Sequence, residues 1–102
     1  MYAVSRALKH LEGGEPDKAI AVCTDALRID SRHTGAYLMR ASGHLRNGTY
    51  DQVVADCTEA IRLDPENHTA YAVRATAYLG MGDSANARAD FARADELESG
   101  RE

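Results

Sequence analysis

Three arginines recur in this sequence at one spacing, and two of them are followed by an aspartate at a fixed distance. Arg6, Arg40 and Arg74 recur with a period of 34, and sixteen residues separate Arg40 from Asp56 and Arg74 from Asp90. An arginine that enters a seam between two helices needs a carboxylate partner, because the loss of its hydration is otherwise uncompensated. We therefore predict a structural ion pair for each of these two arginines.

The first arginine of the series lacks this partner. Val22 occupies the position at which the same spacing would place an aspartate. A second interpretation of the arginines is a ladder that binds an anion from outside the chain. Arg6 is the candidate for such a contact, because its charge has no matching acid within the pattern.

The histidines and cysteines also recur, but their spacing does not predict a metal site or a nucleophile. His10 and His44 share one position of the repeating pattern, and Cys23 and Cys57 share another. Zinc ligands lie about 2 Å from the metal, whereas neighbouring helices pack about 8–10 Å apart. No HExxH or CxxC motif occurs. We predict no metal, no cofactor and no enzymatic activity, and we expect the two cysteines to be small buried hydrophobic residues without a disulfide.

Composition excludes further classes of protein. The chain has 102 residues, a net charge of -4 and 44% hydrophobic residues, which is typical of one small globular domain. Nucleic-acid binding would need clustered lysines and arginines, which this acidic chain lacks. No apolar run approaches the length of about 18–20 residues that spans a membrane. Two cysteines are too few for a disulfide framework, so a cytoplasmic location is expected.

Helical periodicity dominates the chain. Apolar residues spaced three and four apart, with Gly and Pro between the segments, predict an all-α fold. Pro16 stands where a first helical residue is expected, Thr49 with Gln52 has the spacing of a capping box, and Asp83 can cap the last helix. The predicted helices cover residues 2–13, 16–29, 34–47, 50–63, 68–81 and 84–98.

The chain is close to three copies of one unit, because its length of 102 is three times the period of 34. Small residues, turn glycines and large aliphatic residues coincide when the sequence is shifted by this period. The coinciding sets are Gly14, Gly48 and Gly82; Ala7, Ala41 and Ala75; Ala26, Ala60 and Ala94; and Ile29, Leu63 and Leu97. Two helices in each unit of such a period are the signature of a stacked helical repeat.

In these positions the chain resembles the tetratricopeptide repeat family over essentially its whole length. The second unit matches with Tyr37, Ala41, Gly48, Tyr50, Cys57, Ala60 and Leu63-Asp64-Pro65, and the third with Tyr71, Ala75, Tyr78, Gly82, Phe91 and Ala94. The first unit departs from the family at Ala3, His10 and Ser31. The resemblance implies an α-solenoid of three helix-turn-helix repeats, residues 1–33, 34–67 and 68–102, in one right-handed superhelical stack.

The last helix has polar residues where the earlier units are apolar. Arg88 replaces Ile20 and Val54, and Asp95 replaces Leu27 and Ile61 in two sets of matching positions. A polar outer face is expected of a terminal repeat. We therefore expect the third repeat to be a polar C-terminal cap.

The resemblance also implies where a ligand would bind. Ligands of the family contact mainly the first helix of each repeat, on the concave face. The matching positions in this chain are Val4, Leu8, Leu11, Leu38, Ser42, Leu45, Ala72, Thr76 and Leu79. The family's groove for chaperone tails uses Lys, Asn and Arg to grip a C-terminal carboxylate, and these positions hold none of them. The same leucines could instead pack between first helices.

The sequence therefore favours a non-enzymatic module that binds a peptide or helix of a partner protein in a mainly apolar groove. The alternative is a homo-oligomeric scaffold, in which the groove and the first helix, which starts without a capping sequence, bind another copy of the chain. Neither nucleic acid nor membrane is expected as a partner.

Overall fold

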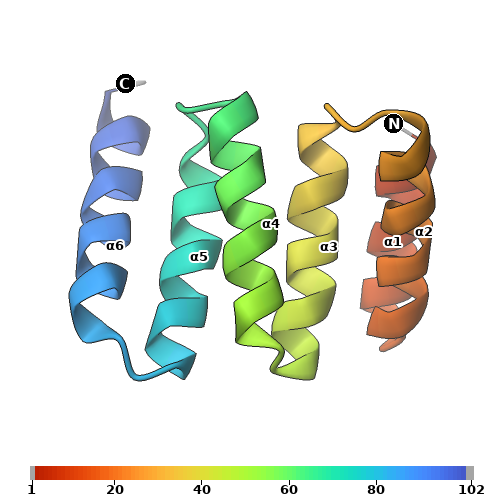
Figure 1. Ribbon diagram of the computed structural model, residues 1–102, viewed down its shortest axis with the longest axis horizontal. Helices are drawn as coiled ribbons and strands as arrows, with labels where there is room; N and C mark the ends of the chain where they lie inside the picture. The colour runs from red at the N-terminus through yellow and green to blue at the C-terminus, as the bar shows by residue number, and fades with distance from the viewer. Residues whose placement is uncertain (1, 101–102) are drawn as a thin grey trace.

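The computed structural model describes residues 2–100, which form six α-helices packed side by side in chain order, each antiparallel to the next (Figure 1). Their bounds are α1 Tyr2–Glu12, α2 Pro16–Ile29, α3 Thr34–Asn47, α4 Tyr50–Leu63, α5 His68–Gly80 and α6 Ser84–Ser99. The predicted all-α fold is confirmed, and the predicted helix ends agree to within one residue. The outer limits of the predicted repeats, Met1 and Glu102, lie outside the described residues.

Helix pairs α1–α2, α3–α4 and α5–α6 are called the first, second and third repeat below. Within each repeat the turn contains a glycine with positive φ, at Gly14 (76°), Gly48 (73°) and Gly82 (79°). A side chain is strained in this left-handed conformation, whereas glycine adopts it freely. The turn that folds the second helix back onto the first therefore depends on the glycine that recurs once in each repeat.

The helix starts agree with the sequence at two sites and differ at a third. Pro16 begins α2, and the carboxylate of Asp83 accepts a hydrogen bond from the Asn86 N–H at the start of α6. The capping box predicted at Thr49 is wrong. The Thr49 hydroxyl makes no capping bond to α4 and donates instead to the carbonyl oxygen of His44 at 3.1 Å. Threonine hydroxyls often bond to nearby backbone, and this local bond competes with the cap.

The core is built from small residues at the repeated positions. Ala7, Ala41 and Ala75 are fully buried, as are Cys23 and Cys57. Small side chains let the helix axes approach closely. One core cluster surrounds Cys23 between α1, α2 and the start of α3, and a second surrounds Cys57 between α3, α4 and α5. The prediction of buried cysteines is confirmed, and both are free thiols.

The contacts between repeats are equally close. A Cβ atom added to Gly43 in α3 would lie 2.8 Å from the Ile20 side chain in α2, so glycine permits this approach. Each second helix thus packs against the first helix of the next repeat, and the core continues through the stack. Within residues 2–100, no helix is long and apolar enough to cross a membrane.

Candidate interaction surfaces

The predicted ion pair of the second repeat is present and joins α3 to α4. Arg40 Nε donates to Asp56 Oδ2 at 3.0 Å, and Arg40 Nη2 donates to Asp56 Oδ1 at 2.8 Å. Asp56 is buried and the Arg40 side chain is mostly buried. This two-pronged geometry is the strong form of an arginine–carboxylate contact. It raises the pKa of Arg40, mainly through the hydrogen bonds to Asp56.

The third repeat contains the same pair between α5 and α6. Arg74 Nε donates to Asp90 Oδ2 at 2.7 Å, and Arg74 Nη2 donates to Asp90 Oδ1 at 2.9 Å. Tyr71 and Tyr78 each lie under this guanidinium, with ring centroids 5.6 and 5.9 Å from Arg74 Cζ. One guanidinium therefore holds a carboxylate and two aromatic rings at the same time.

Sequence reasoning missed a further hydrogen-bond partner of these two arginines. Arg40 Nη1 donates to the Thr24 hydroxyl at 3.3 Å, and Arg74 Nη1 donates to the Thr58 hydroxyl at 3.2 Å. Both threonines belong to the second helix of the preceding repeat, so each arginine joins three helices. The two threonines recur with the same period as the arginines, and this recurrence was the signal that could have identified them.

Arg6 differs from the other two arginines. It is exposed, and its one described contact is with the Tyr2 ring, whose centroid lies 5.2 Å from Arg6 Cζ. Among residues 2–100 it makes no ion pair. The half-buried side chain of Val22 stands where the other repeats place their aspartate.

Three of the predicted groove residues, Leu11, Leu45 and Leu79, occupy the same repeat position but differ in burial. Leu11 is only 3% exposed and belongs to the first core cluster, whereas Leu79 is 54% exposed. Leu45 is half-buried and packs against the second core cluster. Leu11 is therefore core, and its assignment to the groove is wrong. Its side chain lies in the cluster that α1 and α2 form around Cys23.

The other groove positions fall into two sets. Leu8 and Thr76 are exposed, as is Leu79. The rest are half-buried: Val4, Leu38, Ser42, Leu45 and Ala72. Val4 approaches α3, with its side chain 3.0 Å from the position of a Cβ on Gly35. The exposed apolar surface of the first helices therefore lies at the two ends of the array, at Leu8 and Leu79, and not along a continuous line.

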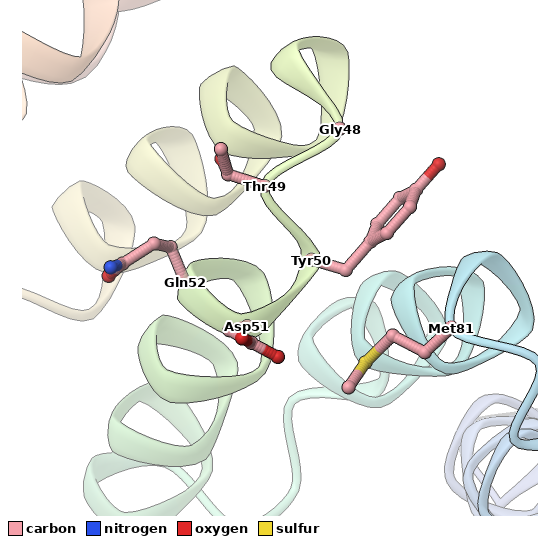
Figure 2. Close-up of a pocket in the computed structure, with 6 residues that line it drawn as sticks. All are labelled: Gly48, Thr49, Tyr50, Asp51, Gln52 and Met81. Carbon is pink, nitrogen blue, oxygen red and sulfur yellow. The ribbon is translucent and has the colours of Figure 1, made fainter.

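One pocket lies where α4 starts and α5 ends. It has a volume of about 360 Å³ and is lined by Gly48, Thr49, Tyr50, Asp51, Gln52 and Met81. Figure 2 shows Asp51 and Met81 directed towards the space between these helices, and Gln52 directed away from Met81. Asp17 and Asn47 hold the matching positions one repeat earlier, where the Asn47 amide donates to the Asp17 carboxylate at 2.8 Å. Methionine has no such donor, so the pocket opens where this bridge is missing.

A second pocket, of about 430 Å³, lies between the N-terminal half of α1 and the C-terminal half of α2. These two helices form the right-hand end of the array in Figure 1. The lining includes Tyr2, Ala3, Arg6, Val22, Ala26 and Ile29. Tyr2 and Ile29 are 76% and 89% exposed, which makes them the most exposed large hydrophobic residues within residues 2–100. The sequence did not predict this pocket.

The repeated cysteines are buried, and the repeated histidines contact residues of the turn that follows their helix. Burial raises the pKa of Cys23 to about 11 and that of Cys57 to about 12, so both thiols stay protonated near neutral pH. His10 Nδ1 lies 3.2 Å from Glu15 Oε1, and His44 Nδ1 lies 3.1 Å from the Thr49 hydroxyl. His33 caps α3 by accepting a hydrogen bond from the Ala36 N–H.

Comparison with known proteins places this architecture in a family. The sequence model of the tetratricopeptide repeat matches residues 68–100. No curated protein matches the chain. Among solved structures, the second TPR domain of human RPAP3, in complex with the HSP70 peptide SGPTIEEVD, is 30% identical with a TM-score of 0.90. That match covers 96% of this chain and 82% of the other.

Two further structures agree with it. The first TPR domain of human RPAP3 is 26% identical with a TM-score of 0.93, over 95% of this chain and 76% of that one. The second TPR of Spaghetti (RPAP3), bound to the HSP90 peptide SRMEEVD, is 28% identical with a TM-score of 0.90, over 94% and 89% of the two chains. With six helices that superpose on these domains, the chain belongs to the tetratricopeptide repeat family of protein-binding modules.

Proposed function

We propose that this chain is a non-enzymatic interaction module that binds a peptide or helix of a partner protein on the face formed by α1, α3 and α5. The observation that carries the proposal is the pair of exposed leucines on this face, Leu8 at 46% and Leu79 at 54%. Two similar domains were solved with peptides bound, which supports peptide binding as the type of activity.

The chemistry of the face suggests the class of peptide. The predicted groove positions other than Leu11 carry apolar, hydroxyl or methyl side chains and no charge. The peptides named for the two similar domains end in acidic residues, for which these positions offer no cation. We therefore expect this face to bind apolar side chains through burial, with affinity that depends weakly on salt.

Selection from a random peptide library displayed on phage, followed by calorimetric titration of the enriched peptides, tests this proposal. Leu79→Glu should weaken binding at least tenfold, because a charge replaces an exposed apolar contact. Met81→Glu is the matched control, since Met81 is an apolar residue of similar exposure, at 46%, that lies outside the groove positions. Both variants should unfold at the parent temperature, because both side chains are exposed.

The proposal fails if the selected peptides are mainly acidic and if their affinity falls steeply as the salt concentration is raised, because salt screens the attraction between charges. It also fails if both variants weaken binding equally, or if neither does. Light scattering over a concentration series tests the alternative of self-association. A mass that rises with concentration in the parent, and not in Leu79→Glu, would assign this face to a second copy of the chain.

A further inference from the structure

The pocket of the first repeat is bordered by two substitutions at repeated positions. Ala3 stands where the other repeats have Tyr37 and Tyr71, and Val22 stands where they have Asp56 and Asp90. The second and third repeats therefore show, within the same chain, which chemical groups this position of the fold normally contains.

The first missing group is an aromatic ring. The Tyr37 and Tyr71 rings lie 5.8 and 5.6 Å from the guanidinium carbons of the arginines in their repeats. A hydrogen bond that Arg93 in α6 donates to the Tyr71 oxygen is the main cause of the raised pKa of Arg93. Arg93 occupies the position that matches Asp25, which lines the first-repeat pocket. The aromatic side chain of the third repeat thus extends over the region that is open above Ala3.

The exposure of Ile29 agrees with the absence of an aromatic ring at Ala3. Leu63 and Leu97 are half-buried, whereas Ile29 at the matching position is 89% exposed. An isoleucine side chain left in water lacks the stabilisation that burial would give it. The side of the pocket formed by Ile29 is therefore suited to an apolar ring.

The second missing group is a carboxylate. Asp56 and Asp90 each accept two hydrogen bonds from the arginine of their repeat. Arg6 has no ion pair within the described part of the chain, and it lines the pocket. A carboxylate entering the pocket would complete the two-pronged contact for which the guanidinium is shaped.

The contact between Tyr2 and Arg6 does not block such a ligand. Arg74 holds two aromatic rings and one carboxylate at once. Arg6 has one ring, that of Tyr2, so its guanidinium retains room for a second ring and a carboxylate. Tyr2 would then form one side of the site rather than occupy it.

The two acidic residues of the pocket, Asp25 and Asp30, each contact a nearby group of the chain. Asp25 pairs with Arg28 at 3.1 Å, and the Asp30 carboxylate accepts a hydrogen bond from the Arg32 N–H at 3.0 Å. His33 accepts its bond from the backbone at the start of α3. Arg6 is the cation among the lining residues, whereas Asp30 keeps its negative charge because a backbone N–H does not neutralise a carboxylate.

We propose that this pocket binds the C-terminal phenylalanine or tyrosine of a partner peptide, with the ring above Ala3 and the terminal carboxylate on Arg6. A terminal aromatic residue carries both missing groups in one residue. The ring and the carboxylate must lie close enough to contact one guanidinium, because they do so in the other repeats. The pocket lining contains neither Leu8 nor Leu79, so this site does not use the residues that carry the function proposed above.

Nuclear magnetic resonance titration of the full chain with acetyl-Gly-Ser-Gly-Phe tests the proposal. The free acid should shift the backbone amides around Tyr2–Arg6 and Val22–Ile29. The same peptide with a C-terminal amide should bind at least about tenfold more weakly, because the amide cannot make the charge-assisted contact with Arg6. A peptide ending in glycine should also bind weakly.

Variants of the protein separate the two groups. Arg6→Gln should remove the preference for the free acid, and Arg88→Gln, an exposed arginine in α6, should not. Ala3→Tyr should fill the ring site and lower the affinity at least tenfold, whereas Ala3→Ser should leave it open. Val22→Asp should pair with Arg6 inside the chain and also remove the preference for the free acid.

Equal binding of the acid and the amide would overturn the proposal, as would parent-like affinity in Arg6→Gln or Ala3→Tyr. A further peptide, acetyl-Gly-Asp-Phe-Gly-amide, carries its acid in a side chain. If this peptide binds and the terminal acid does not, the assignment to a C-terminus is wrong.

Discussion

The first and second repeats share one backbone arrangement but use one arginine position in opposite ways. Arg40 is a structural residue, with Asp56 and Thr24 as partners on two neighbouring helices. Arg6 is exposed, with only the Tyr2 ring as a described contact. The first repeat has Val22 where the second has Asp56, and this one difference leaves the Arg6 guanidinium without a carboxylate partner. The comparison shows that a repeated residue type fixes a location in the fold, whereas its partners decide its role.

Removing the carboxylate of the second repeat should have the largest effect. Asp56→Ala would leave the mostly buried Arg40 guanidinium unpaired, which costs about 3–5 kcal/mol in a buried pair. Asp51→Ala is the control, because Asp51 is exposed and should change stability by less than about 1 kcal/mol. Urea unfolding followed by circular dichroism measures both. Equal midpoints for the two variants would show that the ion pair does not stabilise the fold.

Truncation of the three matched leucines should give graded effects. Leu11→Ala should cost about 2–5 kcal/mol, because it leaves a cavity in the core. Leu79→Ala should change stability by no more than about 0.5 kcal/mol, because its side chain is exposed. Leu45→Ala should fall between them. The same unfolding measurement gives the order, and equal losses at Leu11 and Leu79 would contradict the difference in burial between the repeats.

Giving the first repeat its missing acid should create a measurable coupling. In Val22→Asp, the new carboxylate can pair with Arg6, so the variant should be more stable with Arg6 present than in an Arg6→Gln background. We expect a coupling energy of about 1 kcal/mol from the double-mutant cycle. A coupling near zero would mean that Arg6 cannot reach the position that the matching arginines reach in the other repeats.

Restoring the missing bridge between the second and third repeats should give the smallest effect. Met81→Asn supplies an amide opposite Asp51, as Asn47 does for Asp17 at 2.8 Å. The gain should be about 0.5 kcal/mol for one exposed hydrogen bond, or about 2–4 °C in melting temperature. Adding Asp51→Ala should abolish the gain. If the gain persists without Asp51, its origin is not this hydrogen bond.

Sequence reasoning predicted the helices and the ion pairs because both depend on local or strictly periodic signals. Apolar spacing defines a helix, and a sixteen-residue interval places Asp56 opposite Arg40. It predicted the groove less well, because exposure depends on which helix lies beside a residue. Leu11 and Leu79 occupy one repeat position, yet one is buried and the other is exposed.

The pocket of the first repeat was harder to predict for a related reason. It arises from groups that are missing at Ala3 and Val22, and a sequence pattern reports the residues that are present. Both departures from the repeat were visible in the sequence. Only the packing of α1 on α2 shows that they open onto the same space, together with the exposed rim formed by Tyr2 and Ile29.

The bonds from the arginines to the preceding threonines have a consequence for how the molecule unfolds. Arg40 links the first repeat to the second through Thr24, and Arg74 links the second to the third through Thr58. In a linear array, such interface contacts set the coupling between neighbours and so decide whether repeats open singly or together. Replacing both threonines by valine would weaken this coupling, and hydrogen exchange would then detect opening of α5 and α6 while α1 to α3 remain protected.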